Sequence, residues 1–181
     1  MKAFMQAAGL AQGSANAQSD DQDAQVIPDV WDLHIVGDGP ERGAIEQLIA
    51  SAGPQAVSRI HLLGYKSGED LQREVGNARF TVLSSEWREN MPYSGLESLA
   101  AQTPIIGARI GGIPELVEEG KTGVTFESGD AVDLLNSMRK CSAVSASSYS
   151  SMQRFCREYV NARCLQNKYA LTLIDLYERV I

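Results

Sequence analysis

The sequence lacks the features that mark several large classes of protein. Its 181 residues include 16 Lys and Arg against 23 Asp and Glu, so the net charge is −7. No apolar stretch approaches the roughly 18 residues of a membrane span, and the N-terminus lacks the basic-then-apolar order of a signal peptide. An acidic chain with no basic run of five residues does not suit nucleic acid or an anionic membrane surface. We therefore expect no transmembrane segment and no nucleic-acid partner.

Cysteine and histidine are also scarce. Cys141, Cys156 and Cys164 are odd in number and form no CxxC pair, which favours reduced thiols on helices over a disulfide framework or a metal site. This usage predicts a cytoplasmic location. His34 and His61 each fall within an apolar strand pattern, where a packed or hydrogen-bonded histidine is expected, and nothing in the sequence pairs them.

What is present is the composition of a globular protein, with 44% hydrophobic and 22% charged residues. The length suffices for one well-buried domain of ordinary size. We expect an N-terminal helix remnant at 1–12. Residues 13–29, rich in Ser, Ala, Gln and Asp, should form a flexible linker or loop because they have little to bury. A single domain is then predicted over 30–181.

The hydrophobic periodicity beyond residue 30 alternates between strand and helix patterns. Strands are predicted at 31–36, 60–63, 80–83, 104–106 and 123–126. Helices are predicted at 40–52, 69–75, 92–101 and 113–118, and from 130 onward, with two in 148–181. This alternation predicts an α/β fold, a Rossmann-like doubly wound parallel sheet with C-terminal helices. Ligands of such sheets bind outside the carboxyl ends of the strands, so the loops after Val36, Leu63, Leu83 and Ile106 should converge on one crevice.

The stretch 84–97 is the most informative part of the chain. Glu89 and Glu97 stand either side of seven residues, the first in a strand-to-helix loop and the second about one turn inside the helix. A helix start offers free N–H groups and a positive dipole end, which suit a phosphate. Carboxylates for hydroxyl groups beside N–H groups for a diphosphate are what a nucleotide-sugar site requires. Glu86 competes for the same role, but we interpret it as a solvated or capping residue.

Three glycine-bearing segments follow other predicted strands. Residues 36–40 (Val-Gly-Asp-Gly-Pro) and 110–115 (Ile-Gly-Gly-Ile-Pro-Glu) can bring the backbone close to a ligand, or can simply make a tight turn before a helix. Residues 64–66 (Gly-Tyr-Lys) place an aromatic ring and a cation where they could face a nucleobase, or could be an exposed loop pair. The turn at 120–123 is not a P-loop, because no GxxxxGK[ST] pattern precedes it.

In this order the motifs resemble the C-terminal half of the retaining glycosyltransferases of the glycosyl transferases group 1 family, which have the GT-B fold. The resemblance covers roughly residues 31–127. It is carried by the Gly-Asp-Gly-Pro turn at 37–40, Gly64-Tyr65, the Glu-x7-Glu motif from Glu89 to Glu97, the Gly-Gly-Ile-Pro-Glu segment at 111–115, and Thr122-Gly123 before a strand.

The resemblance implies a hexosyltransferase-type site for a nucleotide-diphospho-sugar donor. Glu97 would hold the ribose hydroxyls, and Glu89, as the catalytic residue, would contact hydroxyls of the donor sugar. The segment from Asn90 to Leu96 would meet the sugar and the diphosphate through its backbone N–H groups. The remaining implied donor-binding residues are Gly37, Gly39, Gly64, Tyr65 and Lys66, with the last three bordering the base. The family retains the sugar's configuration and needs no cofactor or catalytic metal. The members of the 90–96 segment are Asn90, Met91, Pro92, Tyr93, Ser94, Gly95 and Leu96.

The sequence departs from the family pattern at its N-terminal end. The N-terminal acceptor-binding half is missing, and so are the Arg and Lys that clamp the diphosphate, since Lys2 does not match the family lysine. We therefore expect a truncated piece or one half of a split enzyme, inactive without the other half. The alternative is a non-catalytic interaction or regulatory module, which would bind no nucleotide.

The last predicted helix carries a broad apolar surface. This surface either packs on the sheet or lets the chain self-associate. Its members are Tyr169, Leu171, Leu173, Ile174, Leu176 and Tyr177.

Overall fold

The computed structural model describes residues 31–164 and 166–180. The expected helix remnant at 1–12 and the linker at 13–29 lie outside the described residues. Within them the chain forms two compact units. Unit 1 takes in the described residues up to Leu71 together with Asp130–Ala143, and unit 2 takes in Gln72–Gly129 and the described residues from Val144 onward.

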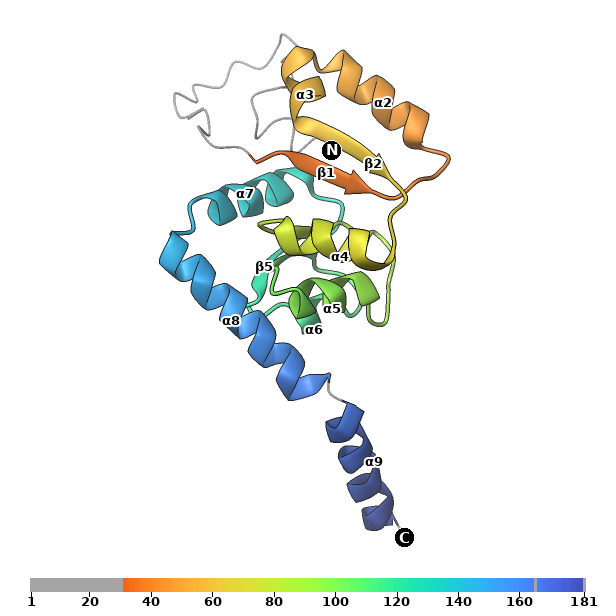
Figure 1. Ribbon diagram of the computed structural model, residues 1–181, viewed down its shortest axis with the longest axis vertical. Coiled ribbons are helices and arrows are strands. Elements are labelled where there is room, and N and C mark those ends of the chain that lie inside the picture. The colour runs from red at the N-terminus through yellow and green to blue at the C-terminus, as the bar shows by residue number, and fades with distance from the viewer. Residues whose placement is uncertain (1–30, 165, 181) are drawn as a thin grey trace. The chain divides into compact units, whose positions relative to one another are not determined.

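Unit 1 is built on a pair of parallel strands, β1 (Leu33–Val36) and β2 (Ile60–Gly64). Two helices connect them, α2 (Arg42–Ser51) and α3 (Pro54–Arg59) (Figure 1). The later helix α7 (Ala131–Ser142) completes the unit. The core consists of apolar side chains that alternate along the strands and recur every three to four residues along α2. Its members are Ile49, Ala56 and Ile60, with Leu33, Ile35, Ile45, Leu48, Ala52, Leu62 and Met138 against them.

Unit 2 is built on a three-stranded parallel sheet in the order β3 (Thr81–Leu83), β4 (Ile105–Ala108), β5 (Gly123–Phe126). All four residues of the central strand β4 are buried. The remaining helices of the unit are α5 (Tyr93–Ala100), α6 (Ile113–Leu116), α8 (Ala146–Arg163) and α9 (Gln166–Val180). Helix α4 (Gly68–Asn77) begins in unit 1 and ends in unit 2.

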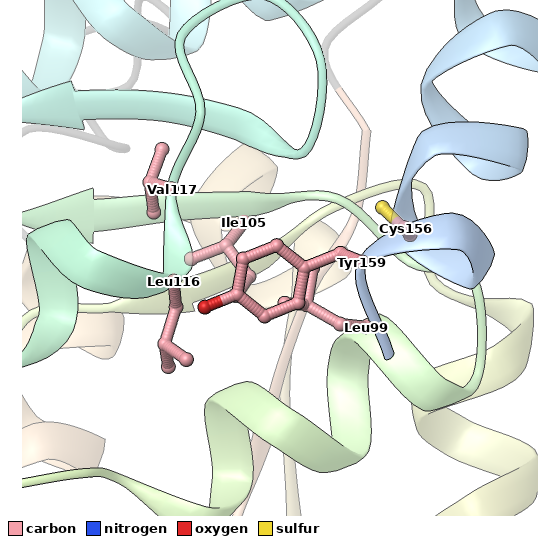
Figure 2. Packing of buried hydrophobic residues seen from close by; sticks show 6 residues of the cluster. All are labelled: Leu99, Ile105, Leu116, Val117, Cys156 and Tyr159. Carbon is pink, nitrogen blue, oxygen red and sulfur yellow. The ribbon is translucent and has the colours of Figure 1, made fainter. Parts of the chain in front are cut away.

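Helix α8 buries three side chains in unit 2, those of Met152, Cys156 and Tyr159. Figure 2 shows Cys156 and Tyr159 beside Leu99, Ile105 and Leu116. The Tyr159 hydroxyl donates to the Glu115 carbonyl at 2.8 Å, so the polar end of the ring is satisfied. Burial raises the pKa of the Cys156 thiol to about 12, which keeps the thiol protonated and unreactive.

The predicted alternation of parallel strands and helices is confirmed, and each predicted strand is present. The ladder hydrogen bonds divide these strands into a pair and a trio, which the alternation did not reveal. Helix α3 was missed, because its six residues are too few to show a helical period and follow the turn signal Gly53-Pro54. The three cysteines are free thiols, as predicted; Cys141 and Cys156 are buried and Cys164 is exposed.

The two histidines do form a pair, so the expectation that nothing pairs them is wrong. His34 lies opposite His61 in the parallel register of β1 and β2, and their rings meet edge to face with centroids 5.2 Å apart. The His61 Nε2 atom also lies 3.5 Å from the Asp32 carboxylate. The pairing depends on strand register, which a single strand pattern does not specify.

Candidate functional site

The two glycine loops of unit 1 meet at the carboxyl ends of β1 and β2. The Gly37 N–H donates to the Gly64 carbonyl at 2.8 Å, which fixes one loop against the other. Gly37 has φ 127° and Gly64 has φ 68°, values that favour glycine. The structure therefore brings Gly37 and Gly39 together with Gly64, Tyr65 and Lys66, and the Tyr65 side chain is 78% exposed.

Sequence reasoning missed a cation in this part of unit 1. The Nη1 atom of Arg42 lies 3.9 Å from the position that a Cβ would take on Gly64. The same guanidinium pairs with Glu46 at 2.9 Å and lies 3.9 Å from Asp38. Arg42 is 22 positions from Gly64 in the sequence, so no local pattern could have indicated that it reaches the second loop.

In unit 2 the loop that carries Glu89 is held by three separate hydrogen bonds. The Glu89 carboxylate accepts a hydrogen bond from the Ser85 hydroxyl at 2.7 Å. The Glu89 carbonyl accepts one from the Gly112 N–H, also at 2.7 Å. The Ser85 carbonyl in turn accepts one from the Ser128 hydroxyl at 3.1 Å. The Glu89 side chain is thus exposed on a backbone that is fixed from both sides.

Gly111 and Gly112 allow this close approach. A Cβ on Gly112 would overlap the carbonyl oxygen of Asn90, and one on Gly111 would lie 2.8 Å from the Glu89 nitrogen. The Gly-Gly segment thus packs closely against backbone of the same chain, and its contact with a ligand stays a prediction. The partner of the close approach in this structure is the loop around Glu89 and Asn90.

Helix α5 presents one polar face and one buried face. Gly95, Ser98 and Leu99 are buried against the sheet, and the Ser98 hydroxyl contacts Thr81 and the Thr103 carbonyl, each at 2.7 Å. Tyr93 and Glu97 are exposed on the other side of the helix, where residues four apart are neighbours.

The N-terminal end of α5 begins with two exposed residues, Tyr93 and Ser94. The preceding residue Pro92 is buried, and within the described residues no side chain caps the helix. The Gly95 and Leu96 N–H groups both bond to the Pro92 carbonyl. The first turn begins with Tyr93 and Ser94, whose N–H groups precede the intrahelical ladder and stand about one turn from Glu97. A carboxylate and a helix terminus thus share one exposed surface.

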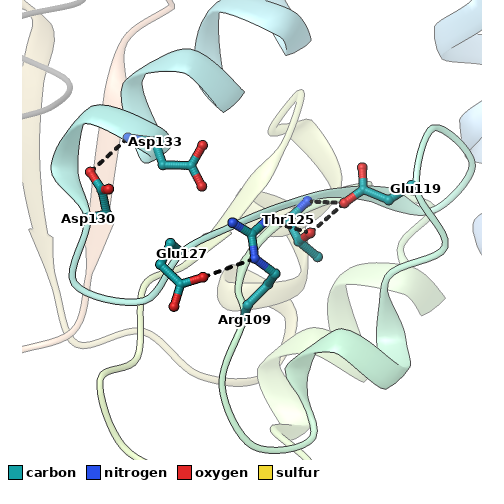
Figure 3. Close-up of polar contacts among 6 residues, drawn as sticks. All are labelled: Arg109, Glu119, Thr125, Glu127, Asp130 and Asp133. Atoms are coloured by element: carbon teal, nitrogen blue, oxygen red, sulfur yellow. Dashed lines mark hydrogen bonds and ion pairs between the residues drawn. The ribbon is translucent and has the colours of Figure 1, made fainter.

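A polar network links Arg109 and Glu127, which follow β4 and β5, with Thr125 inside β5 and Glu119 before it (Figure 3). Arg109 contacts Glu127 at 3.3 Å and donates to the Thr125 hydroxyl at 3.2 Å. Thr125 also donates to the Glu119 carboxylate through its N–H at 2.7 Å and through its hydroxyl at 2.5 Å. The charge of Arg109 is therefore already balanced by a carboxylate of its own unit.

Within each unit, then, the predicted site residues come together. Gly37, Gly39 and residues 64–66 meet in unit 1, and Glu89 through Glu97 form one loop and helix start in unit 2. In each unit the two strand-end loops contact each other through a backbone hydrogen bond. That all four loops converge on one crevice stays a prediction. Among the described residues no three His, Cys, Asp or Glu side chains gather as metal ligands. None of the described helices is long and apolar enough to cross a membrane.

Sequence comparison identifies relatives among glycosyltransferases. A sulfoquinovosyl transferase of Arabidopsis thaliana is 33% identical over 110 residues, which are 59% of this chain and 20% of that protein. The N-acetyl-alpha-D-glucosaminyl L-malate synthase of Bacillus anthracis is 36% identical over 98 residues, 54% of this chain and 24% of that protein. The chain thus spans about a fifth to a quarter of the length of these curated relatives.

Solved structures show the same fold. HepE of Anabaena, solved in complex with UDP, superposes with a TM-score of 0.68 at 21% identity, over 82% of this chain and 42% of that one. A glycosyltransferase from Rickettsia africae gives a TM-score of 0.71 at 20% identity, over 83% and 40%. Both the Rossmann-like fold and the family implied by the motifs are confirmed. Because the profile of the family described as Glycosyl transferases group 1 matches residues 20–143, the chain belongs to that family.

Proposed function

We propose that this chain binds the nucleotide-diphospho-sugar donor of a retaining glycosyltransferase. The observation that carries the proposal is the fixed loop of unit 2. It presents the Glu89 carboxylate next to the uncapped start of α5, with Glu97 one turn further on. Relatives named as sugar transferases, and the fold shared with an enzyme solved with UDP, support it.

The roles follow from the chemistry of each group. Glu97 can accept hydrogen bonds from two neighbouring ribose hydroxyls, and a charged acceptor makes such bonds strong. The N–H groups at the start of α5 can donate to the diphosphate, where the helix dipole also favours negative charge. Glu89 is proposed to bind hydroxyls of the donor sugar, and the segment 90–96 to line the sugar and diphosphate. In unit 1, Gly64, Tyr65 and Lys66 are proposed to border the base, and Gly37 and Gly39 to contact the donor.

The test of donor binding is calorimetric titration of the chain with UDP, GDP and ADP. We expect saturable binding of one nucleotide. Glu97→Ala should weaken it about 10- to 100-fold, because a charge-assisted hydrogen bond contributes about 1.5–3 kcal/mol. Glu86→Ala is the matched control, an exposed carboxylate of the same loop, and should leave the affinity unchanged. No binding of any nucleotide at millimolar concentration would mean either that the missing Arg and Lys clamp is indispensable or that the chain is the non-catalytic module, and a chain extended N-terminally through the clamp would then decide.

Sugar recognition is tested separately from nucleotide recognition. Glu89→Gln keeps the shape of the side chain and removes its charge. It should lower the affinity for the nucleotide-sugar while leaving the affinity for the free nucleotide unchanged. Equal losses for both ligands would mean that Glu89 acts on the nucleotide or on the loop rather than on the sugar.

Transfer itself is proposed to need the acceptor-binding half that the longer relatives would supply, so that this chain alone binds without turnover. We propose that transfer retains the sugar's configuration, takes place in the cytoplasm and requires no metal. Mixing the chain with a supplied acceptor-binding half should give a product whose anomeric configuration NMR can read. The rate should be the same with EDTA as with added Mg²⁺. An inverted product would overturn retention, and loss of rate in EDTA would overturn metal independence.

A further inference from the structure

Trp87 is the most exposed large hydrophobic residue in the part of the chain that the structure describes, with 82% of its surface accessible. Tryptophan is highly buried on average, because its indole ring offers a large apolar area. None of the described residues makes a hydrogen bond or a ring contact with this indole. The indole therefore lies outside the core of unit 2 and is available to a ligand.

Trp87 stands at the middle of a small closed loop. The Ser85 hydroxyl donates to the Glu89 carboxylate at 2.7 Å, and this bond closes a ring in the chain with Trp87 at its centre. Both ends of the ring are tied to other segments of unit 2. The Ser128 hydroxyl donates to the Ser85 carbonyl at 3.1 Å, and the Gly112 N–H donates to the Glu89 carbonyl at 2.7 Å.

The residue between Trp87 and Glu89 is held as well. A Cβ on Gly111 would lie 3.2 Å from the Cα of Arg88, so the Gly-Gly segment packs against the backbone at this point of the loop. The indole is thus carried on a backbone with little freedom. Ordering it on a ligand costs little beyond the entropy of its side-chain torsions, which favours binding by an aromatic ring.

The proposed donor contacts follow the chain in one direction. From Glu97 through the start of α5 to Glu89, they pass from the ribose to the diphosphate and then to the sugar. Trp87 comes next. Its Cα lies within about 7 Å of the Glu89 Cα, because two residues of extended chain span no more than that. An indole at this position can reach the sugar ring whose hydroxyls Glu89 is proposed to bind.

A pyranose ring presents two kinds of surface, which need two kinds of partner. Its edge carries hydroxyl groups, and a carboxylate accepts hydrogen bonds from them. Its faces carry C–H groups, whose slightly positive hydrogens suit the electron-rich face of an aromatic ring. Glu89 and Trp87 offer both partners on one fixed loop.

We propose that Trp87 is the stacking platform for the donor sugar, with its indole against a C–H face of the ring whose hydroxyls Glu89 binds. This inference rests on the proposed function and narrows its substrate. The platform favours a donor whose sugar is a pyranose with a continuous C–H face, since an open-chain group has no face to stack.

The test is acrylamide quenching of Trp87 fluorescence in a Trp31→Phe background. UDP-glucose, GDP-mannose and ADP-glucose are each compared with UDP, GDP and ADP, at concentrations that calorimetry shows to be saturating. Acrylamide should quench the indole readily in the free chain, because the residue is exposed. The nucleotide-sugar that binds should lower the quenching by about half, because stacking covers one face of the ring. The matching free nucleotide should not lower it.

Calorimetry of variants measures how much the platform contributes to affinity. Trp87→Ala should weaken binding of the nucleotide-sugar about 3- to 10-fold, as expected for the loss of a stacking contact, and should leave the affinity for the free nucleotide unchanged. Trp87→Phe keeps an aromatic face and should lose less. Glu86→Ala changes an exposed neighbour on the same loop, so it is the matched control and should bind as the unaltered chain does.

Two outcomes would overturn the platform and leave the proposed function intact. In the first, the nucleotide-sugar binds while Trp87 stays fully quenched, as it would if the indole faced another part of a longer enzyme. In the second, Trp87→Ala weakens nucleotide and nucleotide-sugar equally, which would mean damage to the loop. If no ligand binds, the chain extended N-terminally through the Arg and Lys clamp is titrated in the same way. Absence of binding there would overturn the proposed function and the platform together.

Discussion

The loops of the two units are held in different ways, although each lies at the carboxyl ends of parallel strands. In unit 2 the loop around Glu89 is fixed by hydrogen bonds from Ser85 and Gly112 and by backbone packing so close that a Cβ does not fit. In unit 1 the hydrogen bond that ties the two loops runs from Gly37 to Gly64, and a Cβ on Gly37 or Gly39 would meet open space. The loop around Glu89 is therefore held in one conformation, and the loop at Gly37 and Gly39 has room to adapt.

The largest effect should come from Gly112→Ala, which attacks the fixed loop. The new methyl group would overlap the Asn90 carbonyl, so either the loop or the start of α6 must move. We expect a loss of about 3 kcal/mol in the free energy of unfolding. Native-state hydrogen exchange of the amides in β3, β4 and β5 measures this for unit 2.

The control for that substitution is Gly76→Ala, in helix α4 of the same unit. A Cβ at position 76 has open space around it, and alanine is the better helix former by about 1 kcal/mol. Unit 2 should therefore become slightly more stable. If Gly112→Ala were as mild as Gly76→Ala, the loop would not be held by close packing and the contrast between the units would fail.

Gly37→Ala should have the next largest effect, for a different reason. Here there is space for a methyl group, but φ of 127° lies in a region that alanine rarely adopts. We expect a loss of about 2 kcal/mol confined to unit 1, because the cost is backbone strain. Trp31 fluorescence in a Trp87→Phe background reports this unit, and a loss of stability in unit 2 instead, read from the hydrogen exchange of its strand amides, would contradict the assignment.

Much of this could be predicted from the sequence, because strands and helices have local signatures. The alternation indicates the fold, and the position of Glu89 after a strand and of Glu97 one turn into a helix is confirmed. The contact of Arg42 with the Gly64 loop and the pairing of His34 with His61 could not be predicted. Both depend on which residues of distant segments lie opposite one another, and a one-dimensional pattern holds no such register.

The packing that holds the loop around Glu89 in place also could not be predicted from the sequence. From its residues alone, the Gly-Gly segment at 111–112 could be either a tight turn or a ligand contact. The structure shows that it packs against the backbone of the loop that carries the candidate catalytic Glu89. A glycine required for space and one required for its φ look the same in a sequence, and only the neighbouring atoms distinguish them.

Ser85→Ala should have a smaller effect, directed at the ligand. It removes the hydroxyl that holds the Glu89 carboxylate at 2.7 Å on the protein surface. An exposed hydrogen bond of this kind contributes about 0.5–1 kcal/mol, so the stability of unit 2 should change little. Affinity for a nucleotide-sugar should fall about two- to fivefold, because the freed carboxylate must be ordered on binding. Calorimetry with sugar-bearing and sugar-free nucleotide in parallel would show whether the loss is confined to the sugar.

The smallest effect on stability is expected for Gly39→Ala. This glycine has no positive φ, and no atom lies within 4 Å of the position that a methyl group would take, so the free energy of unfolding should stay within about 0.5 kcal/mol. Gly39 lies two residues from Gly37, so comparing the two substitutions distinguishes a glycine needed for its φ from a glycine needed for the space that it leaves. If Gly39 serves close approach of a ligand, the substitution should lower nucleotide affinity in a protein that unfolds normally. Unchanged affinity would instead mean that the loop at 37–40 is a structural turn that happens to lie at the strand ends.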